Sequence, residues 1–192
     1  MKIRRAVFLD RDGVINESNG FITDVRDVKI IKEVPEAIKI LNKHFYVIVI
    51  TNQPQVARGL CTEKEAKKIN SHIIKDLRKS GAKIDAVFYC PHHPEKHSDT
   101  PKTARKYRID CGCRKPKIGM IVQAKKRFRL DLKKCYFVGD TTVDIKTGKN
   151  SGCKTILLRT GYAGSDNKFK VKPDFVCNTL MKATKIIIDD CK

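Results

Sequence analysis

Short apolar runs alternate with amphipathic segments along almost the whole chain, and this alternation constrains the fold more than any other feature. Short apolar runs that end at charged or turn-forming residues predict buried strands, and helical spacing of apolar residues predicts helices between them. Strands that are apolar throughout are typical of parallel sheets covered by helices on both faces. We therefore predict an α/β fold with strands at 5–10, 46–51, 86–89, 135–139, 155–158 and 175–177. Helices are expected to start near Pro35 and Thr62 and to cover 119–129, 143–150 and 180–188.

The length of the chain sets the number of domains. It has 192 residues, of which 41% are hydrophobic, which suits one domain with a sizeable core. No apolar run approaches the length that spans a bilayer, and the first one stops at Asp10, too early for a signal peptide. We expect a single domain over residues 1–192, located in the cytoplasm and with no membrane partner.

The chain is strongly basic, with 41 Lys and Arg against 21 Asp and Glu and a net charge of +20. Such a field attracts anions of every kind, so the charge alone names no partner. The Lys and Arg residues are scattered along helical segments and Trp is absent. Nucleic-acid binders usually gather their Lys and Arg in one stripe with aromatic residues between them. A small anionic substrate is therefore favoured over nucleic acid.

Polar and acidic clusters follow three of the predicted strands. The first strand ends in DRDG, which contains Asp10 and Asp12; the second ends in TNQ, and the fourth ends in GDTTVD, which contains Asp140 and Asp144. Ligands of parallel α/β sheets bind at the carboxyl ends of the strands, so these residues are expected to share one crevice. Carboxylates gathered there need a hard cation between them, and Mg²⁺ prefers oxygen ligands.

These residues have the chemistry that phosphoryl transfer requires. With Mg²⁺ bound, Asp10 is placed to attack phosphorus, and Asp12 can exchange a proton with the leaving oxygen and then with water. The Thr51 hydroxyl and the Lys115 ammonium would stabilise charge on the phosphoryl oxygens. A lone Asp after a strand is more often a helix cap or a turn residue. Unrelated turns, however, have no reason to give DRDG, TNQ, RKP and GDTTVD in that order.

The interval 90–117 has no periodicity and is rich in Pro, His, Lys and Arg, so it is expected to be functional or tied by a metal. It contains soft ligands in two close pairs, enough for one closed, structural zinc site. The site would hold Arg114 and Lys115 toward the phosphate. Buried or redox-active thiols are the alternative, and His93 or His97 could replace the histidine of the first pair. The predicted zinc ligands are Cys90, His92, Cys111 and Cys113.

The order of these motifs resembles the haloacid dehalogenase superfamily, whose signature is a strand-borne DxD, a Thr or Ser after the second strand, a Lys, and GD followed by an acid. The resemblance implies a Rossmann-like parallel sheet with a minimal cap, and a magnesium-dependent phosphatase that works through an aspartyl-phosphate on Asp10. It implies that Asp12 is the acid/base, and that magnesium is held by Asp10, Asp140 and the Asp12 backbone carbonyl. Asp144 would contact the metal through water, orient Lys115 or cap a helix.

The motifs CPHHP, CxCRKP and DRDGVIN further resemble the zinc-carrying D-glycero-D-manno-heptose 1,7-bisphosphate 7-phosphatase branch. This resemblance implies removal of the C7 phosphate of a sugar bisphosphate, on the way to nucleotide-activated heptose for surface polysaccharide, by a monomer with an open site. Pro54-Gln55-Val56 and Thr141 depart from the usual branch sequence at positions that bear on the sugar or its anomer. The substrate contacts implied are Ser18, Asn19, Gly20, Phe21, Thr51, Asn52, Gln53, Arg58, Arg114 and Lys115.

Three other functions fit parts of the sequence. Histidinol-phosphate phosphatases share the DxD and a similar zinc loop. A polynucleotide 3'-phosphatase would account for TNQ and for the net charge. A non-catalytic zinc module could bind nucleic acid through residues 102–117, although it would have no need of the catalytic acids.

Overall fold

Six parallel strands form one sheet in the order β3-β2-β1-β4-β5-β6. The computed structural model describes residues 5–18, 20–95 and 101–191. Each predicted strand is present, with ends that differ from the expected ones by at most one residue, and the predicted parallel α/β fold is confirmed. The strands are β1 (Ala6–Leu9), β2 (Tyr46–Asn52), β3 (Ala86–Cys90), β4 (Tyr136–Gly139), β5 (Lys154–Leu158) and β6 (Phe175–Cys177).

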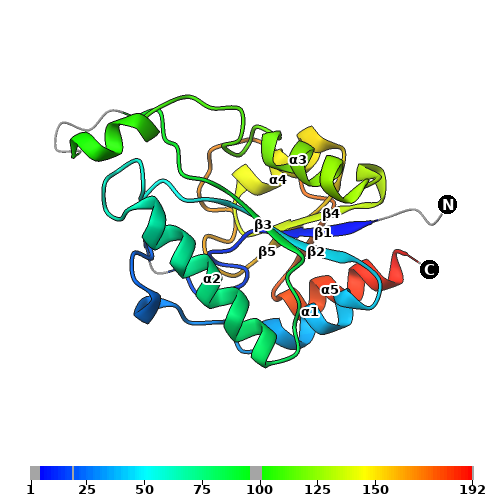
Figure 1. The fold of residues 1–192 in the computed structure, drawn as a ribbon. Coiled ribbons are helices and arrows are strands. Elements are labelled where there is room, and N and C mark those ends of the chain that lie inside the picture. The colour runs from blue at the N-terminus through cyan, green and yellow to red at the C-terminus, as the bar shows by residue number, and fades with distance from the viewer. Residues whose placement is uncertain (1–4, 19, 96–100, 192) are drawn as a thin grey trace.

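Helices cover both faces of the sheet (Figure 1). Side chains alternate between the two faces of a strand, so Val7 and Leu9 of β1 belong to one apolar core and Ala6 and Phe8 to the other. The first core also contains residues of α1 (Val34–Asn42), α2 (Glu63–Lys79) and α5 (Leu180–Asp189). The opposite face is covered by α3 (Gly119–Phe128) and α4 (Thr142–Ser151).

Local sequence signals set the helix ends. Thr62 and Glu65 form the predicted capping box at the start of α2, satisfying two of its free backbone donors. Gly81, at φ +79°, follows the end of that helix in the left-handed conformation that glycine adopts at low cost. The short 3-10 helices are η1 (Val25–Asp27), η2 (Lys102–Tyr107) and η3 (Leu132–Lys134). The η2 helix lies inside the interval that was expected to have no regular structure.

The strand order places a topological switch point beside β1. β2 pairs with one edge of β1, and β4 pairs with the other. The loops that follow β1 and β4 therefore run to opposite sides of the sheet, which opens a crevice at the carboxyl ends of these strands. Asp10 follows β1 and Asp140 follows β4, so both reach this crevice. Among residues 5–18, 20–95 and 101–191, no helix has the length and apolar character to cross a membrane.

Candidate active site

A cavity of about 460 Å³ opens at the carboxyl ends of β1, β2 and β4. The sequence clusters predicted to meet there do line it: Asp10 and Asp12 come from the first strand end, Thr51 and Asn52 from the second, and Asp140, Thr141 and Asp144 from the fourth. The predicted crevice therefore exists, and it contains more acidic than basic side chains at its floor. The functional roles of the individual residues remain predictions.

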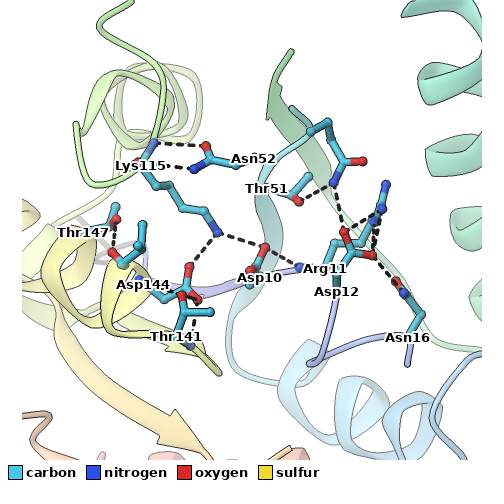
Figure 2. A network of polar contacts seen from close by, with 12 residues as sticks. Asp10, Arg11, Asp12, Asn16, Thr51, Asn52, Lys115, Thr141, Asp144 and Thr147 are labelled. Carbon is cyan, nitrogen blue, oxygen red and sulfur yellow. Dashed lines mark hydrogen bonds and ion pairs between the residues drawn. The ribbon is translucent and has the colours of Figure 1, made fainter. Parts of the chain in front are cut away.

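Lys115 supplies the positive charge at that floor. Its ammonium lies 2.9 Å from Asp10 Oδ1 and 2.6 Å from Asp144 Oδ1, between the two carboxylates (Figure 2). The Lys115 side chain is only 3% exposed, so solvent screens these contacts little. The second oxygen of Asp144 accepts from the Thr141 backbone and hydroxyl at the start of α4. Asp144 therefore orients Lys115 and caps the helix, two of the three alternatives open from the sequence.

Asp140 has the environment expected of a cation ligand. Its Oδ1 is buried and has no hydrogen-bond partner in the part of the chain that the structure describes, an arrangement that costs free energy unless another group pairs with it. Its Oδ2 accepts from the Tyr162 backbone at 2.8 Å. A Cβ at Gly13 or Gly161 would collide with this carboxylate, so the two glycines leave it room. Oxygens of Asp10, Asp140 and Asp144 lie within 4.8 Å of one another, and this oxygen set suits Mg²⁺.

The acids at the floor are hard to ionise without a cation. Burial, followed by the charge of Asp144, raises the pKa of Asp10 to about 7, although Lys115 offsets part of the effect. Burial and the charges of Asp10 and Asp144 raise the pKa of Asp140 to about 8. For Lys115, burial favours the neutral form, but the two carboxylates outweigh it and raise the pKa above the ordinary lysine value. A bound divalent cation would favour the ionised carboxylates.

Asp12 is held on the other side of Asp10 (Figure 2). The Arg11 guanidinium donates to both of its oxygens, at 2.7 to 2.9 Å, although the two residues are neighbours in sequence. Asn16 donates to Oδ1 at 2.9 Å and Gln53 to Oδ2 at 3.2 Å. Arg11 is itself buried and is fixed by Asn70 of α2 at 3.0 Å. The carboxylate that was predicted to be the acid/base is therefore held in place by donors from three residues.

Most of the residues predicted to contact substrate line the cavity, and others are packed behind the lining residues. Ser18, Gly20, Phe21, Thr51, Asn52, Arg114 and Lys115 line the cavity, and Asn19 lies outside the described residues. Gln53 is fully buried behind the wall, where its amide donates to Thr51 Oγ1 at 2.8 Å. The guanidinium of Arg58 lies over the Phe21 ring at 5.1 Å and pairs with Glu95 at 3.3 Å.

The predicted zinc ligands Cys90, His92, Cys111 and Cys113 form a compact cluster. Their ligand atoms lie within 4.8 Å of one another. The three sulfur pairs are 3.0, 3.2 and 3.4 Å apart, and His92 Nδ1 lies 3.6 Å from Cys90 and 3.5 Å from Cys113. These separations exceed the length of a disulfide, about 2.05 Å. Three sulfurs and one imidazole nitrogen at this spacing fit a tetrahedral zinc ion with no open position.

The Cys/His cluster is connected to the cavity through its own loop. Cys90 ends β3, and the chain that follows Cys113 leads directly into Arg114 and Lys115. Arg114 donates to the His92 carbonyl at 3.1 Å, and Lys115 exchanges two backbone hydrogen bonds with the Asn52 amide, at 3.0 and 3.2 Å. The backbone of Lys115 is thus fixed from both the cluster and β2.

Comparisons with known proteins assign this chain to a family. The HAD-hydrolase-like family model matches residues 112–183. The D-glycero-beta-D-manno-heptose-1,7-bisphosphate 7-phosphatase of Haemophilus ducreyi is 36% identical to this chain, covering 93% of this chain and 95% of its own length. The corresponding alpha enzyme of Photorhabdus laumondii is 33% identical and covers 95% and 96%.

This chain belongs to the heptose-1,7-bisphosphate 7-phosphatase family. A crystal structure of the D,D-heptose 1,7-bisphosphate phosphatase from B. bronchiseptica, complexed with magnesium and phosphate, superimposes with a TM-score of 0.82 at 27% identity. The alignment covers 98% of this chain and 99% of that chain. The resemblance to the haloacid dehalogenase superfamily inferred from the sequence is thereby confirmed.

Several cavity residues of this family member were missed by sequence reasoning. His93, Tyr162, Lys168 and Phe169 line the cavity, and Gln55, only 2% exposed, donates to Gln53 at 2.5 Å and to the Ile22 carbonyl at 3.3 Å. One signal was present: Tyr162 and Lys168 follow β5, and the loop after that strand also faces the carboxyl edge. Gln55 belongs to the segment Pro54-Gln55-Val56, which the sequence marked as bearing on the sugar, but its contacts with Gln53 and Ile22 were not predicted.

Proposed function

We propose that this chain is a magnesium-dependent phosphatase that removes the C7 phosphate of D-glycero-D-manno-heptose 1,7-bisphosphate. The observation that carries the proposal is the cavity at the switch point, where Asp10 lies beside Lys115 and beside a buried Asp140 oxygen without a partner. The family members from Haemophilus ducreyi and Photorhabdus laumondii support the choice of substrate. We propose one domain over residues 1–192 that acts as a monomer.

In the first half of the reaction Asp10 attacks the phosphorus of the C7 phosphate. Its Oδ1 accepts from Lys115 and from the Arg11 backbone at 2.7 Å, and its Oδ2 has no donor among the described side chains and backbone groups, which leaves that oxygen open. The phosphorus bond to the C7 oxygen breaks as the bond to Asp10 forms. Asp12 gives its proton to the departing oxygen, yielding the sugar alcohol and an aspartyl-phosphate.

In the second half, Asp12, now a carboxylate, takes a proton from a water molecule that attacks the aspartyl-phosphate. The phosphorus bond to Asp10 breaks, phosphate leaves and the nucleophile is restored. Lys115 and the Thr51 hydroxyl stabilise the phosphoryl oxygens as their charge rises. Magnesium held by Asp10, Asp140 and the Asp12 carbonyl would neutralise the excess negative charge at the floor of the site.

We further propose that Cys90, His92, Cys111 and Cys113 bind one structural zinc ion, which fixes the loop 90–117. Each of the eight cysteines is a free thiol, which fits a reducing compartment such as the cytoplasm. Purified protein should contain about one zinc per chain by elemental analysis. Replacing Cys113 with Ser should remove most of that zinc. It should also lower the activity, because Cys113 lies only two residues before Lys115 in the same loop. As a control, Cys153→Ser changes a buried thiol that does not belong to the Cys/His cluster, and it should leave the zinc content unchanged.

Phosphate release from a panel of substrates tests the proposed activity. The panel contains the α and β anomers of the heptose bisphosphate, histidinol phosphate and a 3'-phosphorylated oligonucleotide, at one salt and one magnesium concentration. We expect kcat/KM to be highest for one of the two bisphosphate anomers. Preferred turnover of histidinol phosphate or of the oligonucleotide would overturn the assignment, and nucleic-acid binding as the sole activity would favour a zinc binding module.

A further inference from the structure

Two basic side chains besides Lys115 line the cavity. They are Arg114 and Lys168, and His93 and Glu95 line the cavity as well. Glu95 pairs with Arg58, which lies behind it. Among the described residues, no carboxylate lies within ion-pair distance of Arg114 or Lys168, and the charge of Glu95 acts on Arg114 only at longer range.

Lys168 is placed over the cavity by a specific anchor. Asp166 accepts from the backbone and the hydroxyl of Thr142, at 2.6 and 2.7 Å, in the first turn of α4. Phe169 donates its backbone N–H to the same hydroxyl at 3.2 Å. Because the residues on both sides of Lys168 are bonded to one threonine, its backbone has little freedom to move away from the cavity.

The backbone around Lys168 is held by hydrogen bonds, but its ammonium has no partner among the described residues. In the ranges 5–18, 20–95 and 101–191, no carboxylate forms an ion pair with it and no group hydrogen-bonds it, and the side chain is exposed. The guanidinium of Arg114 donates to the His92 carbonyl and pairs with no carboxylate in the same ranges. Two cations on segments held by hydrogen bonds, with no ion-paired carboxylate among the described residues, are suited to bind an anion that enters the cavity.

Building on the proposed function, we infer that Lys168, together with Arg114, binds the phosphate of the bisphosphate that is not hydrolysed. The transferred phosphate lies at the floor beside Lys115, and Lys168 reaches the same cavity from the loop after β5. The remaining phosphate of the bound sugar needs further cationic groups, and Arg114 and Lys168 supply them. Lys168 is then a specificity-determining residue, since a sugar with one phosphate would not engage it.

The test compares Lys168→Ala with wild type on two substrates, the heptose 1,7-bisphosphate and heptose 7-phosphate, which lacks the second phosphate. A hydrogen bond between charged groups contributes about 1.5–3 kcal/mol, or roughly 10- to 150-fold in affinity, and exposure places Lys168 at the lower end. We expect kcat/KM for the bisphosphate to fall about tenfold, mainly through a higher KM. The value for heptose 7-phosphate should stay within about twofold of wild type.

Two further variants separate a phosphate contact from other effects. Lys168→Arg keeps the cation and should retain most of the activity on the bisphosphate. Lys170→Ala removes an exposed lysine of the same loop that does not line the cavity, and should change neither substrate. An equal loss on both substrates in Lys168→Ala, or a similar loss in Lys170→Ala, would overturn the inference, as would an unchanged KM for the bisphosphate.

The outcome for the proposed function is read separately, from the wild-type protein. If wild type releases no phosphate from the bisphosphate, the proposed function fails, whatever the variants do. If wild type hydrolyses the bisphosphate at a much higher kcat/KM than heptose 7-phosphate, and Lys168→Ala keeps that ratio, the function stands and the assignment of Lys168 fails.

Discussion

At the residue scale, the candidate site is organised around one buried ion-pair system. Lys115 contacts Asp10 and Asp144, and Arg11 contacts Asp12. The sequence predicted the chemistry of Asp10, Asp12 and Lys115, because each belongs to a motif at a strand end or beside one. It could not predict that Arg11 folds back onto its neighbour, or that Gln55 supports Gln53. Arg11 is oriented by Asn70 and Gln55 by the Ile22 carbonyl, and both of these groups are far away in the chain.

Replacing the nucleophile gives the sharpest test at this scale. Asp10→Asn keeps the size of the side chain but removes the negatively charged attacking oxygen, so we expect phosphate release to fall by at least about a thousandfold. Circular dichroism and zinc content should match those of wild type. Asp27→Asn, an exposed change of the same kind in η1, serves as the control and should retain full activity. Substantial activity in Asp10→Asn would rule out the covalent route.

At the element scale, the two adjacent histidines show what a loop pattern leaves undetermined. The sequence favoured His92 as the zinc ligand and left His93 and His97 as alternatives. In the structure His92 lies in the Cys/His cluster, whereas His93 lines the cavity, and His97 lies outside the described residues. Successive side chains of an extended backbone point to opposite sides, which explains the division of the pair. The strands, in contrast, were predictable, because a short buried apolar run can be recognised from its own residues without knowing which segments pack against it.

The N-terminus of α2 provides an element-scale prediction of pH dependence. Hydrogen bonds from Tyr89, Lys67 and Tyr107 lower the pKa of Glu63 to about 2 from 4.5, and thereby tie α2 to β3 and η2. Because the folded-state pKa is depressed, this contribution to stability is present in full above about pH 4.5 and is lost as the pH falls through about 2. Wild type should therefore melt at a higher temperature than Glu63→Gln at pH 6, and the difference should shrink toward pH 2.

Thermal unfolding of both proteins between pH 6 and pH 2 measures this difference. Other acid-sensitive groups, including the Cys/His cluster, are shared by the two proteins, so their effects largely cancel in the comparison. A gap in melting temperature that stays constant down to pH 2 would contradict the assignment.

At the scale of the whole molecule, the net charge of +20 acts on every anionic ligand. A positive field raises the encounter rate with a negatively charged substrate, and salt screens it over a Debye length of about 10 Å at 0.1 M. We expect kcat/KM for the bisphosphate to fall several-fold between about 20 and 300 mM NaCl, with kcat changing much less. The dependence should be weaker for heptose 7-phosphate, which carries less charge. A salt-independent kcat/KM would show that the field does not guide the substrate.

The position of Lys115 also bears on how a newly made chain acquires its metal. Its ammonium already accompanies the carboxylates of Asp10 and Asp144, so the crevice carries an internal counter-ion before any cation arrives. We therefore expect the core of the chain to form before a divalent cation binds, because these ion pairs involve only groups of the chain itself.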